Sequence, residues 1–185
     1  PITDLVGQNS RPVAPDEPWF PCKKNDWVLL GDGTRGKVTG ISLEMVQLIQ
    51  RGGVKKTYQT ADFLANTPHN LSTNFRLKET FGISYNLQQQ STGKILETLY
   101  QYIQQQAEQE GYKEKLLNLR VEFESAAESS LNLVVIADFD GELAELYNRL
   151  RRAIQRWCVD ACTENNWEIP FPQRTIHMIK NDTLE

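Results

Sequence analysis

The sequence predicts an α+β protein in which a small β-barrel is followed by a ferredoxin-like βαββαβ unit. Short strand-like segments separated by glycine turns fill residues 22–72, a pattern typical of small barrels with strongly bent strands. Residues 73–180 combine alternating strand patterns with two helical stripes in the order β-α-β-β-α-β, which is the split βαβ arrangement. A proline-rich lead-in (residues 1–21) and a short tail (residues 181–185) complete the predicted organisation.

Length and charge exclude several classes of protein. The chain has 185 residues, 24% of them charged and 39% hydrophobic, with a net charge of −4. This balance is close to the globular average and argues against wholesale disorder. The acidic balance argues against a general nucleic-acid binder, which usually carries a basic excess. No segment approaches the roughly 20 apolar residues of a membrane-spanning helix, and the first residues do not resemble a secretion signal.

The barrel prediction follows from the order of strands and turns. Five of the eight prolines lie in residues 1–21, so no helix or strand is predicted there. Trp19 and Phe20, at the end of this lead-in, are expected to dock on the barrel that follows. The pair Gly52-Gly53 predicts a tight hairpin turn, and Thr60 is expected to cap one helical turn over residues 61–64. A polar segment, residues 66–74, is expected to close the barrel. Strands are predicted at residues 26–30, 35–42, 43–49 and 54–59.

The second unit has a clearer periodicity. A helix is predicted from Ser91 until Gly111 stops it, and a longer helix from Gly141, each with apolar residues at spacings of three and four. Each predicted strand has one apolar face, so both helices should cover one side of the sheet while the other side meets solvent or a neighbour. Strands are predicted at residues 75–85, 117–123, 131–139 and 175–179.

No constellation of residues predicts catalysis, a cofactor or a metal. Cys22, Cys158 and Cys162 are too few for a disulfide framework and are interpreted as buried apolar side chains in a reducing compartment. His69 and His177 have no ligand spacing typical of zinc. Phosphate-binding loops, dinucleotide fingerprints and nucleophile elbows are missing from the sequence. We therefore expect no enzymatic activity, no cofactor and no metal site.

Charged residues leave two interpretations open. Arg149, Arg152 and Arg156, with Arg151 beside them, line one side of the long helix opposite its apolar stripe. A solvated helix face has this pattern, but the same stripe could serve a polar contact between subunits or face ions. Two predicted strands each contain a pair of carboxylates, at Glu122 and Glu124 and at Asp138 and Asp140. None of them has an obvious partner for acid–base catalysis, so they are interpreted as surface charge.

Three motifs in fixed order resemble small-conductance mechanosensitive channels, the MscS family. NDWVLLGD (residues 25–32) with GKVTGISL (residues 36–43) resembles the start of that family's β-domain. FGISY (residues 81–85) resembles the strand that opens its α/β domain, and IPFPQRT (residues 169–175) the segment after its last long helix. The similarity covers about residues 20–180, and the order and spacing of the motifs make it specific.

The resemblance implies a role in a channel. Family members are typically heptamers whose membrane helices form a tension-gated pore. Below the pore, Sm-like β-barrel domains form a ring and α/β domains form a cytoplasmic vestibule with side portals. The expected function is therefore the vestibule of a mechanosensitive channel, which releases osmotic pressure by ion transport across the cell membrane, with roles in homo-oligomer assembly and solute filtering. The family's pore-lining helix would precede Trp19, where this chain has prolines. Either the membrane helices have been removed or this relative is divergent there; the expected contact with the membrane is through helices absent from this chain. A second departure is that residues 58–62 replace an apolar-Pro-Asn turn.

One segment is a candidate oligomer contact: Ile169, Pro170, Phe171, Pro172 and Gln173. The two prolines fix their backbone angles and hold Phe171 as a rigid apolar group, so the segment could direct the final strand toward a neighbouring subunit. The alternative is an ordinary loop in which Phe171 fills its own core.

Two further functions remain open. Small barrels and ferredoxin-like domains also bind RNA, through the barrel or the open sheet face, although this mode needs exposed aromatic residues for base stacking and the predicted open face has none; no nucleic-acid partner is expected. A regulatory domain for a small ligand is the third possibility, which ligand-induced stabilisation would reveal.

Overall fold

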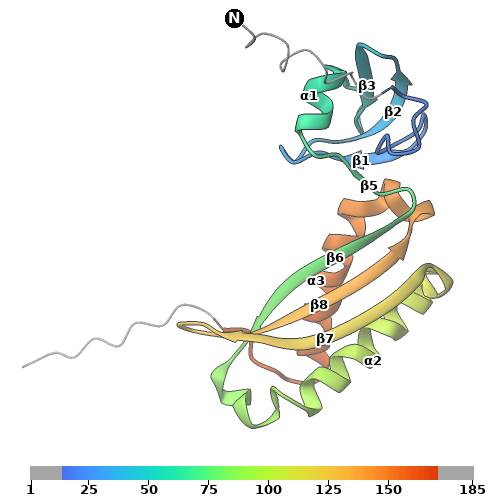
Figure 1. The fold of residues 1–185 in the computed structure, drawn as a ribbon. Coiled ribbons are helices and arrows are strands. Elements are labelled where there is room, and N and C mark those ends of the chain that lie inside the picture. The colour runs from blue at the N-terminus through green and yellow to red at the C-terminus, as the bar shows by residue number, and fades with distance from the viewer. Residues whose placement is uncertain (1–13, 171–185) are drawn as a thin grey trace, which may run out of the picture. The chain divides into compact units, whose positions relative to one another are not determined.

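The computed structural model describes residues 14–170 and has the mixed α+β architecture predicted from the sequence (Figure 1). Its contacts divide the chain into two compact units. The first unit contains residues up to Arg76 together with Glu114–Leu117 and Asp138–Asn148, and the second contains the remainder. The domain boundary at residues 72 and 73 stays a prediction.

The first sheet contains five antiparallel strands in the order β4-β3-β2-β1-β5. Its edges are β4 and β5, and among the described residues they do not join, so the predicted closed barrel is not seen. The sequence interpretation missed β5 because its two residues, a polar pair with no alternation, are too short to show a period; they pair with β1 alone. The strands are β1 (Trp27–Leu29), β2 (Arg35–Ile41), β3 (Met45–Ile49), β4 (Lys55–Gln59) and β5 (His69–Asn70).

Glycines set the bends of this sheet. Gly52 and Gly53 have φ of 91° and 86°, and consecutive positive φ values belong to the tight hairpin turn predicted between β3 and β4. The β2–β3 register shifts between Val38 and Gly40, which confirms the predicted bend of β2.

Helix α1 (Thr60–Ala65) covers the core of this sheet. The helical turn was predicted correctly, but the cap was not: Gln59 is the N-cap residue, and the Thr60 hydroxyl donates instead to the Ser42 carbonyl at 3.1 Å. Phe63 of α1 is fully buried and stacks on Phe20 at 6.4 Å between ring centroids. The predicted docking of Phe20 is thus confirmed, whereas Trp19 is 67% exposed and the prediction for it was wrong.

The second sheet has the order β6-β8-β7, with α2 and α3 on the same side of it (Figure 1). The first strand of this part therefore lies beside the third, as in a split βαβ unit. The predicted fourth strand, residues 175–179, lies outside the described residues, so the ferredoxin-like class stays a prediction. The elements are β6 (Asn74–Ile83), η1 (Tyr85–Gln90), α2 (Lys94–Gln109), η2 (Lys113–Lys115), β7 (Leu116–Ala126), β8 (Leu131–Asp140), η3 (Gly141–Leu146) and α3 (Tyr147–Glu164), where η marks a 3₁₀ helix.

The predicted helical stripes form the core of this sheet. Ile95, Leu99 and Ile103 of α2 are buried, as are Ile154 and Trp157 of α3. Burial of these stripes, at roughly 25 cal/mol per Å² of apolar surface, stabilises both helices against the sheet.

Two element boundaries differ from the prediction. Gly141 opens η3 rather than the long helix, which begins at Tyr147. A Cβ at Gly141 would lie 1.9 Å from the Ser72 carbonyl oxygen, so close approach of two backbone segments explains this glycine. Tyr85 was assigned to the buried face of a strand, but β6 ends at Ile83 and Tyr85 is 40% exposed in η1, because the Ser84 side chain caps that 3₁₀ helix.

Candidate self-association surfaces

The end of α3 sets the direction of the candidate contact segment. Asn166 has a φ of 54°, and the N–H of Trp167 donates to the carbonyl of Cys162 at 2.8 Å. A weaker bond joins the Asn166 N–H to the carbonyl of Thr163 at 3.4 Å. These two bonds and the left-handed residue make a Schellman motif, which stops the helix by satisfying its last carbonyl groups. The chain therefore leaves α3 in a fixed direction at Trp167.

The next residues are attached to the region where β6 ends. The Ser84 N–H donates to the carbonyl of Glu168 at 3.1 Å, and the Asn86 amide donates to the Glu168 carboxylate at 2.9 Å. Ile169 comes next, 42% exposed, and Pro170 is half-buried. A cavity of about 220 Å³ lies here, lined by Ser84, Tyr85, Asn86, Glu128, Ser129, Glu168 and Pro170.

Only part of the predicted contact segment can be placed. Ile169 and Pro170 are described, and Ile169 presents apolar surface to solvent. Phe171, Pro172 and Gln173 lie outside the described residues. Both hypotheses for Phe171 therefore stay open.

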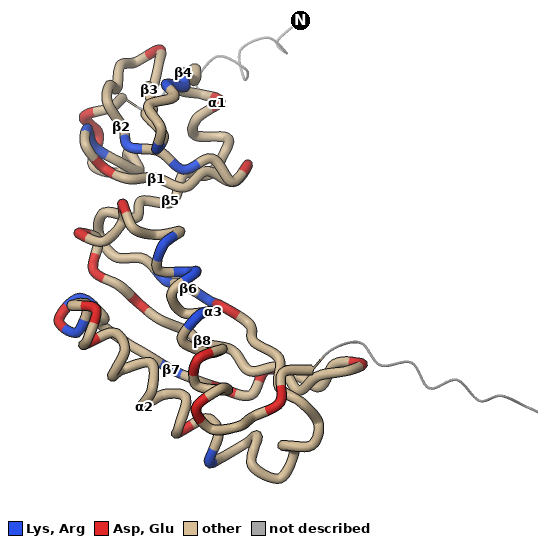
Figure 2. The backbone as a smooth tube through the Cα atoms, turned by 180° about the vertical axis from the view of Figure 1, so that it is seen from behind, with Lys and Arg blue, Asp and Glu red and all other residues tan. Residues whose placement is uncertain are grey.

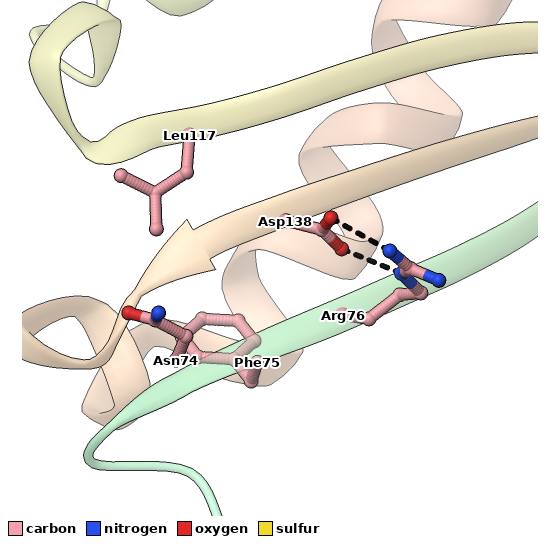
Figure 3. A pocket seen from close by; sticks show the side chains of 5 residues that line it. All are labelled: Asn74, Phe75, Arg76, Leu117 and Asp138. Atoms are coloured by element: carbon pink, nitrogen blue, oxygen red, sulfur yellow. Dashed lines mark hydrogen bonds and ion pairs between the residues drawn. The ribbon is translucent and has the colours of Figure 1, made fainter.

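The first unit has a hollow beside one charged pair. Arg76 donates through Nε and Nη2 to the two oxygens of Asp138, at 2.6 and 2.8 Å (Figure 3). This bidentate bond raises the pKa of Arg76. The pair lines a cavity of about 510 Å³ with Asn74, Phe75 and Leu117. Because the arginine is already bonded to a carboxylate, the hollow offers little attraction for an anion.

The polar sheet face of the second unit is also charge-paired. Lys78 and Glu124 lie 2.8 Å apart, and the Thr80 hydroxyl donates to Glu124. These bonds, with that from Lys78 the largest cause, lower the pKa of the Glu124 carboxyl. Arg120 and Glu122 form a second pair at 3.3 Å. Cations held by carboxylates are poorly placed to bind phosphates, so the RNA-binding alternative gains no support.

Strand β7 has apolar side chains that its own sheet does not cover. The sequence placed Leu117, Leu119, Val121 and Phe123 on one buried face. Leu119 is buried at 8% exposure, but Leu117 is 50% exposed and Phe123 is 39% exposed. The burial expected for this face is confirmed for Leu119 and wrong for Leu117 and Phe123, because alternation does not show how much of a face other elements cover.

A second group of exposed apolar side chains lies in the five-stranded sheet and its turns. Leu43, in the connection before β3, is 60% exposed, Met45, the first residue of β3, is 52% exposed, and Val54 in the next turn is 56% exposed. Their neighbours Val46 and Leu48 are fully buried. Strand alternation therefore predicted two faces, and burial shows which of them is the core.

Arg35 of β2 holds η3 within the first unit. Its Nη1 donates to the carbonyls of Ala144 and Glu145 at 3.0 and 3.3 Å. Its guanidinium carbon lies 4.9 Å from the Trp27 ring centroid and 6.0 Å from that of Tyr147. Burial, with a smaller contribution from Arg51, lowers the pKa of Arg35. The sequence did not identify this residue because the two carbonyl groups to which it donates are more than 100 positions away.

The basic positions of α3 follow one another along the helix (Figure 2), and two of them have carboxylate partners in the second unit. Arg151 donates to Glu79 of β6, and Arg156 donates to Glu110 at the end of α2. Trp157 also donates to Glu110, at 2.9 Å. Part of the predicted basic stripe thus serves contacts between elements of one chain.

Potential metal ligands and thiols both occur within residues 14–170. No group of three or more potential ligands there could hold a metal ion. All three cysteines are buried and free, and burial raises the pKa of the Cys22 and Cys158 thiols to about 12. In the same part of the chain, none of the helices has both the length and the apolar character needed to cross a bilayer.

Comparison with known proteins identifies similar structures. The sequence matches no protein-family model and no curated protein. The crystal structure of MscS from Helicobacter pylori in its closed state superposes with a TM-score of 0.63 over 88% of this chain, at 20% identity. Two cryo-EM structures of MSL1 from Arabidopsis thaliana superpose over 83% of the chain, with TM-scores of 0.55 and 0.52 at 12% and 14% identity.

The similarity covers most of this chain but only part of each channel. The chain spans 61% of the length of the Helicobacter pylori MscS chain and 52% and 54% of the two MSL1 chains. The resemblance seen in the three sequence motifs is thus confirmed at the level of the fold: this chain has the fold of MscS-family mechanosensitive channels over the part of those channels that it spans.

Proposed function

We propose that this chain forms the cytoplasmic vestibule of a mechanosensitive ion channel that releases osmotic pressure. The observation that carries the proposal is the superposition of 88% of the chain on closed-state MscS at a TM-score of 0.63. The three motifs at residues 25–43, 81–85 and 169–175 support it independently, since they depend on the sequence and not on the fold. In this role the chain assembles with copies of itself, filters solutes and has no catalytic activity.

The proposed assembly is a ring, with seven subunits as the family resemblance implies. A ring forms when one patch on a subunit meets a different patch on the next subunit. Exposed apolar side chains at Leu43, Met45, Leu117 and Ile169 provide surface that is better buried than left in water. The membrane portion of this channel would lie in helices outside this chain, with the present region on the cytoplasmic side of the cell membrane.

Native mass spectrometry of the purified chain over a range of concentrations tests the assembly. A species of seven chains is the expected result. A chain that stays monomeric at about 1 mM contradicts self-assembly of this region, because ring contacts of standard size bind far more tightly than that.

Osmotic challenge tests the channel role. The coding sequence that contains this chain, with its flanking codons, is expressed in bacteria that lack mechanosensitive channels. Survival of a sudden drop in external osmolarity is expected, and no survival despite membrane expression contradicts the proposal. The matched control is the chain of residues 1–185 alone, in which no helix of the described part could span a membrane.

The segment from Ile169 to Gln173 is proposed to direct the end of the chain toward a neighbouring subunit. Phe171→Ala separates the two hypotheses for this segment. Loss of the oligomer with an unchanged thermal transition of the monomer supports the subunit contact. Loss of the folded state instead shows that Phe171 fills its own core.

A further inference from the structure

Strand β7 is an open edge of its sheet in the described part of the chain. It lies beyond β8 in the order β6-β8-β7 and extends over 11 residues, Leu116–Ala126. Its sequence, LLNLRVEFESA, has no proline, the residue that cannot donate a backbone hydrogen bond to a further strand. The unpaired N–H and C=O groups of such an edge are a template for a further strand.

The two faces of β7 differ in chemistry at its centre. Leu119, Val121 and Phe123 alternate on one face, where Phe123 is 39% exposed and Val121 is half-buried. Arg120 and Glu122 lie on the other face, where they pair with each other at 3.3 Å and keep side chains that are 48% and 49% exposed. The strand therefore presents an apolar row and a pair of opposite charges around Val121.

We infer that β7 pairs with β7 of a second copy of this chain, antiparallel and centred on Val121. In this register Arg120 faces Glu122 of the second copy, and Glu122 faces the second copy's Arg120. Pairing with a second copy therefore exchanges the weak, exposed ion pair within each chain for the equivalent pairs between two chains. On the other face, Leu119 lies opposite the second copy's Phe123. Opposite charges and apolar pairs directly across antiparallel strands are the contacts that stabilise a sheet.

The neighbouring registers are unfavourable. Centring the pair on Arg120 places two arginines opposite each other, and centring it on Glu122 does the same for two glutamates; like charges directly opposite are destabilising. If one strand shifts by one residue, its apolar side chains lie on the same side of the joined sheet as the polar side chains of the other strand. Charge complementarity therefore selects a second copy as the occupant and Val121 as the centre.

This contact is independent of the proposed ring. It is two-fold symmetric, whereas a ring joins different patches, so it would link two chains or two rings. A single pair of strands buries less area than a standard interface, and the expected dissociation constant is weak, roughly 10–100 µM.

Charge exchange tests the register in the full chain by sedimentation velocity. Arg120→Glu and Glu122→Lys each place like charges opposite one another, so each variant alone should self-associate about tenfold more weakly. An equimolar mixture of the two variants restores opposite charges across the contact and should form heterodimers with the affinity of the wild type. Folding of each variant is checked by its thermal transition, and a mixture that associates no better than its components overturns the inference.

Crosslinking gives a second readout that does not depend on charge. Val121→Cys should form an intermolecular disulfide on oxidation, because paired β residues bring their Cα atoms within disulfide reach. Ser125→Cys is the control on the same strand: in this register the two Ser125 positions lie about 27 Å apart and should not crosslink. The native cysteines are buried and add little background.

The outcomes separate this inference from the proposed function. A seven-chain species with no crosslink through Val121→Cys overturns the β7 contact and leaves the ring intact. A crosslinked dimer without any larger ring supports the β7 contact and contradicts the ring. Equal crosslinking of the Val121→Cys and Ser125→Cys variants overturns the register.

Discussion

Arg151 of α3 donates through Nε to the carboxylate of Glu79 at 2.5 Å, inside an otherwise apolar contact between helix and sheet. Glu79 lies between Leu77 and Phe81 on the buried face of β6 and is 8% exposed. Gln155, one turn further along α3, donates to the same carboxylate at 3.2 Å. The acid therefore fixes the helix against the strand through directional bonds that apolar packing lacks.

Removal of this carboxylate should destabilise the fold. Glu79→Ala leaves donors of α3 without their acceptor and is expected to lower the free energy of unfolding by about 2–3 kcal/mol. Glu79→Gln keeps an acceptor oxygen and should lose about half as much. Urea denaturation of the purified chain measures both, and a loss below about 0.5 kcal/mol for Glu79→Ala contradicts the assigned role.

Arg35 should contribute more than its exposed neighbour Arg51. Arg35→Met removes bonds to two carbonyl groups and the contacts with the Trp27 and Tyr147 rings, and a loss of about 1–2 kcal/mol is expected. Arg51→Met removes an ion pair with Glu145 whose side chains are 51% and 59% exposed, which should cost at most about 0.5 kcal/mol. If both substitutions lowered the free energy of unfolding by the same amount in chemical denaturation, the contacts of Arg35 would stabilise the fold no more than the exposed ion pair of Arg51 does.

Gly141 should tolerate no side chain. A Cβ there meets the Ser72 carbonyl oxygen at 1.9 Å and the Thr73 oxygen at 2.8 Å, so Gly141→Ala must move backbone, at an expected cost of about 3 kcal/mol or more. In Gly40→Ala, the matched control, the new Cβ has its nearest contact at 4.0 Å, and the change should stay within about 1 kcal/mol. A normal thermal transition for Gly141→Ala would contradict the close approach.

The cysteines should be unreactive until the protein unfolds. Burial raises the pKa of Cys22 and Cys158 to about 12 and that of Cys162 to about 11, and the thiolate is the reactive form. At pH 8, a thiol reagent should modify the native chain only slowly. In denaturant, the same reagent should rapidly modify all three thiols of the chain. Rapid modification of one thiol in the native state would show that its burial is incomplete.

The bonds to Glu124 should stabilise the fold in a pH-dependent way. Hydrogen bonds from Lys78 and Thr80 lower the pKa of this carboxyl below its ordinary value of 4.5. A carboxyl with a lower pKa in the folded state contributes stability above its unfolded pKa, and this contribution disappears as the pH falls through the folded pKa. Glu124→Gln should therefore lower the melting temperature at pH 7 and have a smaller effect at pH 3. A difference that stays constant between these pH values would refute the assignment.

The extent of agreement between sequence and structure differs from element to element. The stripe of Ile95, Leu99 and Ile103 predicted α2 because helical spacing repeats over several turns and leaves one interpretation. The two residues of β5 gave no signal, since a period needs more than one repeat. Tyr85 continues the alternation of β6 in the sequence but lies in η1. The Ser84 side chain accepts a hydrogen bond from the Asn86 N–H and so begins the 3₁₀ helix before Tyr85 can extend the strand.

The candidate site was predicted less completely than the fold. The motif at residues 169–175 pointed to the segment after α3, and the helix does end at Glu164 with Ile169 exposed. Nothing in the sequence singled out the exposed part of β7, because alternation marks an apolar face without showing whether another element covers it. Glu79 was overlooked for a similar reason: one acid in an apolar row gives no sign of its partner in α3.

The amino-acid sequence alone determined the α+β class, the order of the longer strands and helices, both helical stripes and the family whose fold this chain shares, since these depend on local periodicity and short motifs. Only the tertiary structure decided that β4 and β5 are the two edges of their sheet within residues 14–170, that Arg35 and Glu79 bind groups remote in sequence, and that Phe123 remains in contact with solvent. Those features depend on which segments meet across long separations, and burial and hydrogen-bond geometry exist only once the segments have packed.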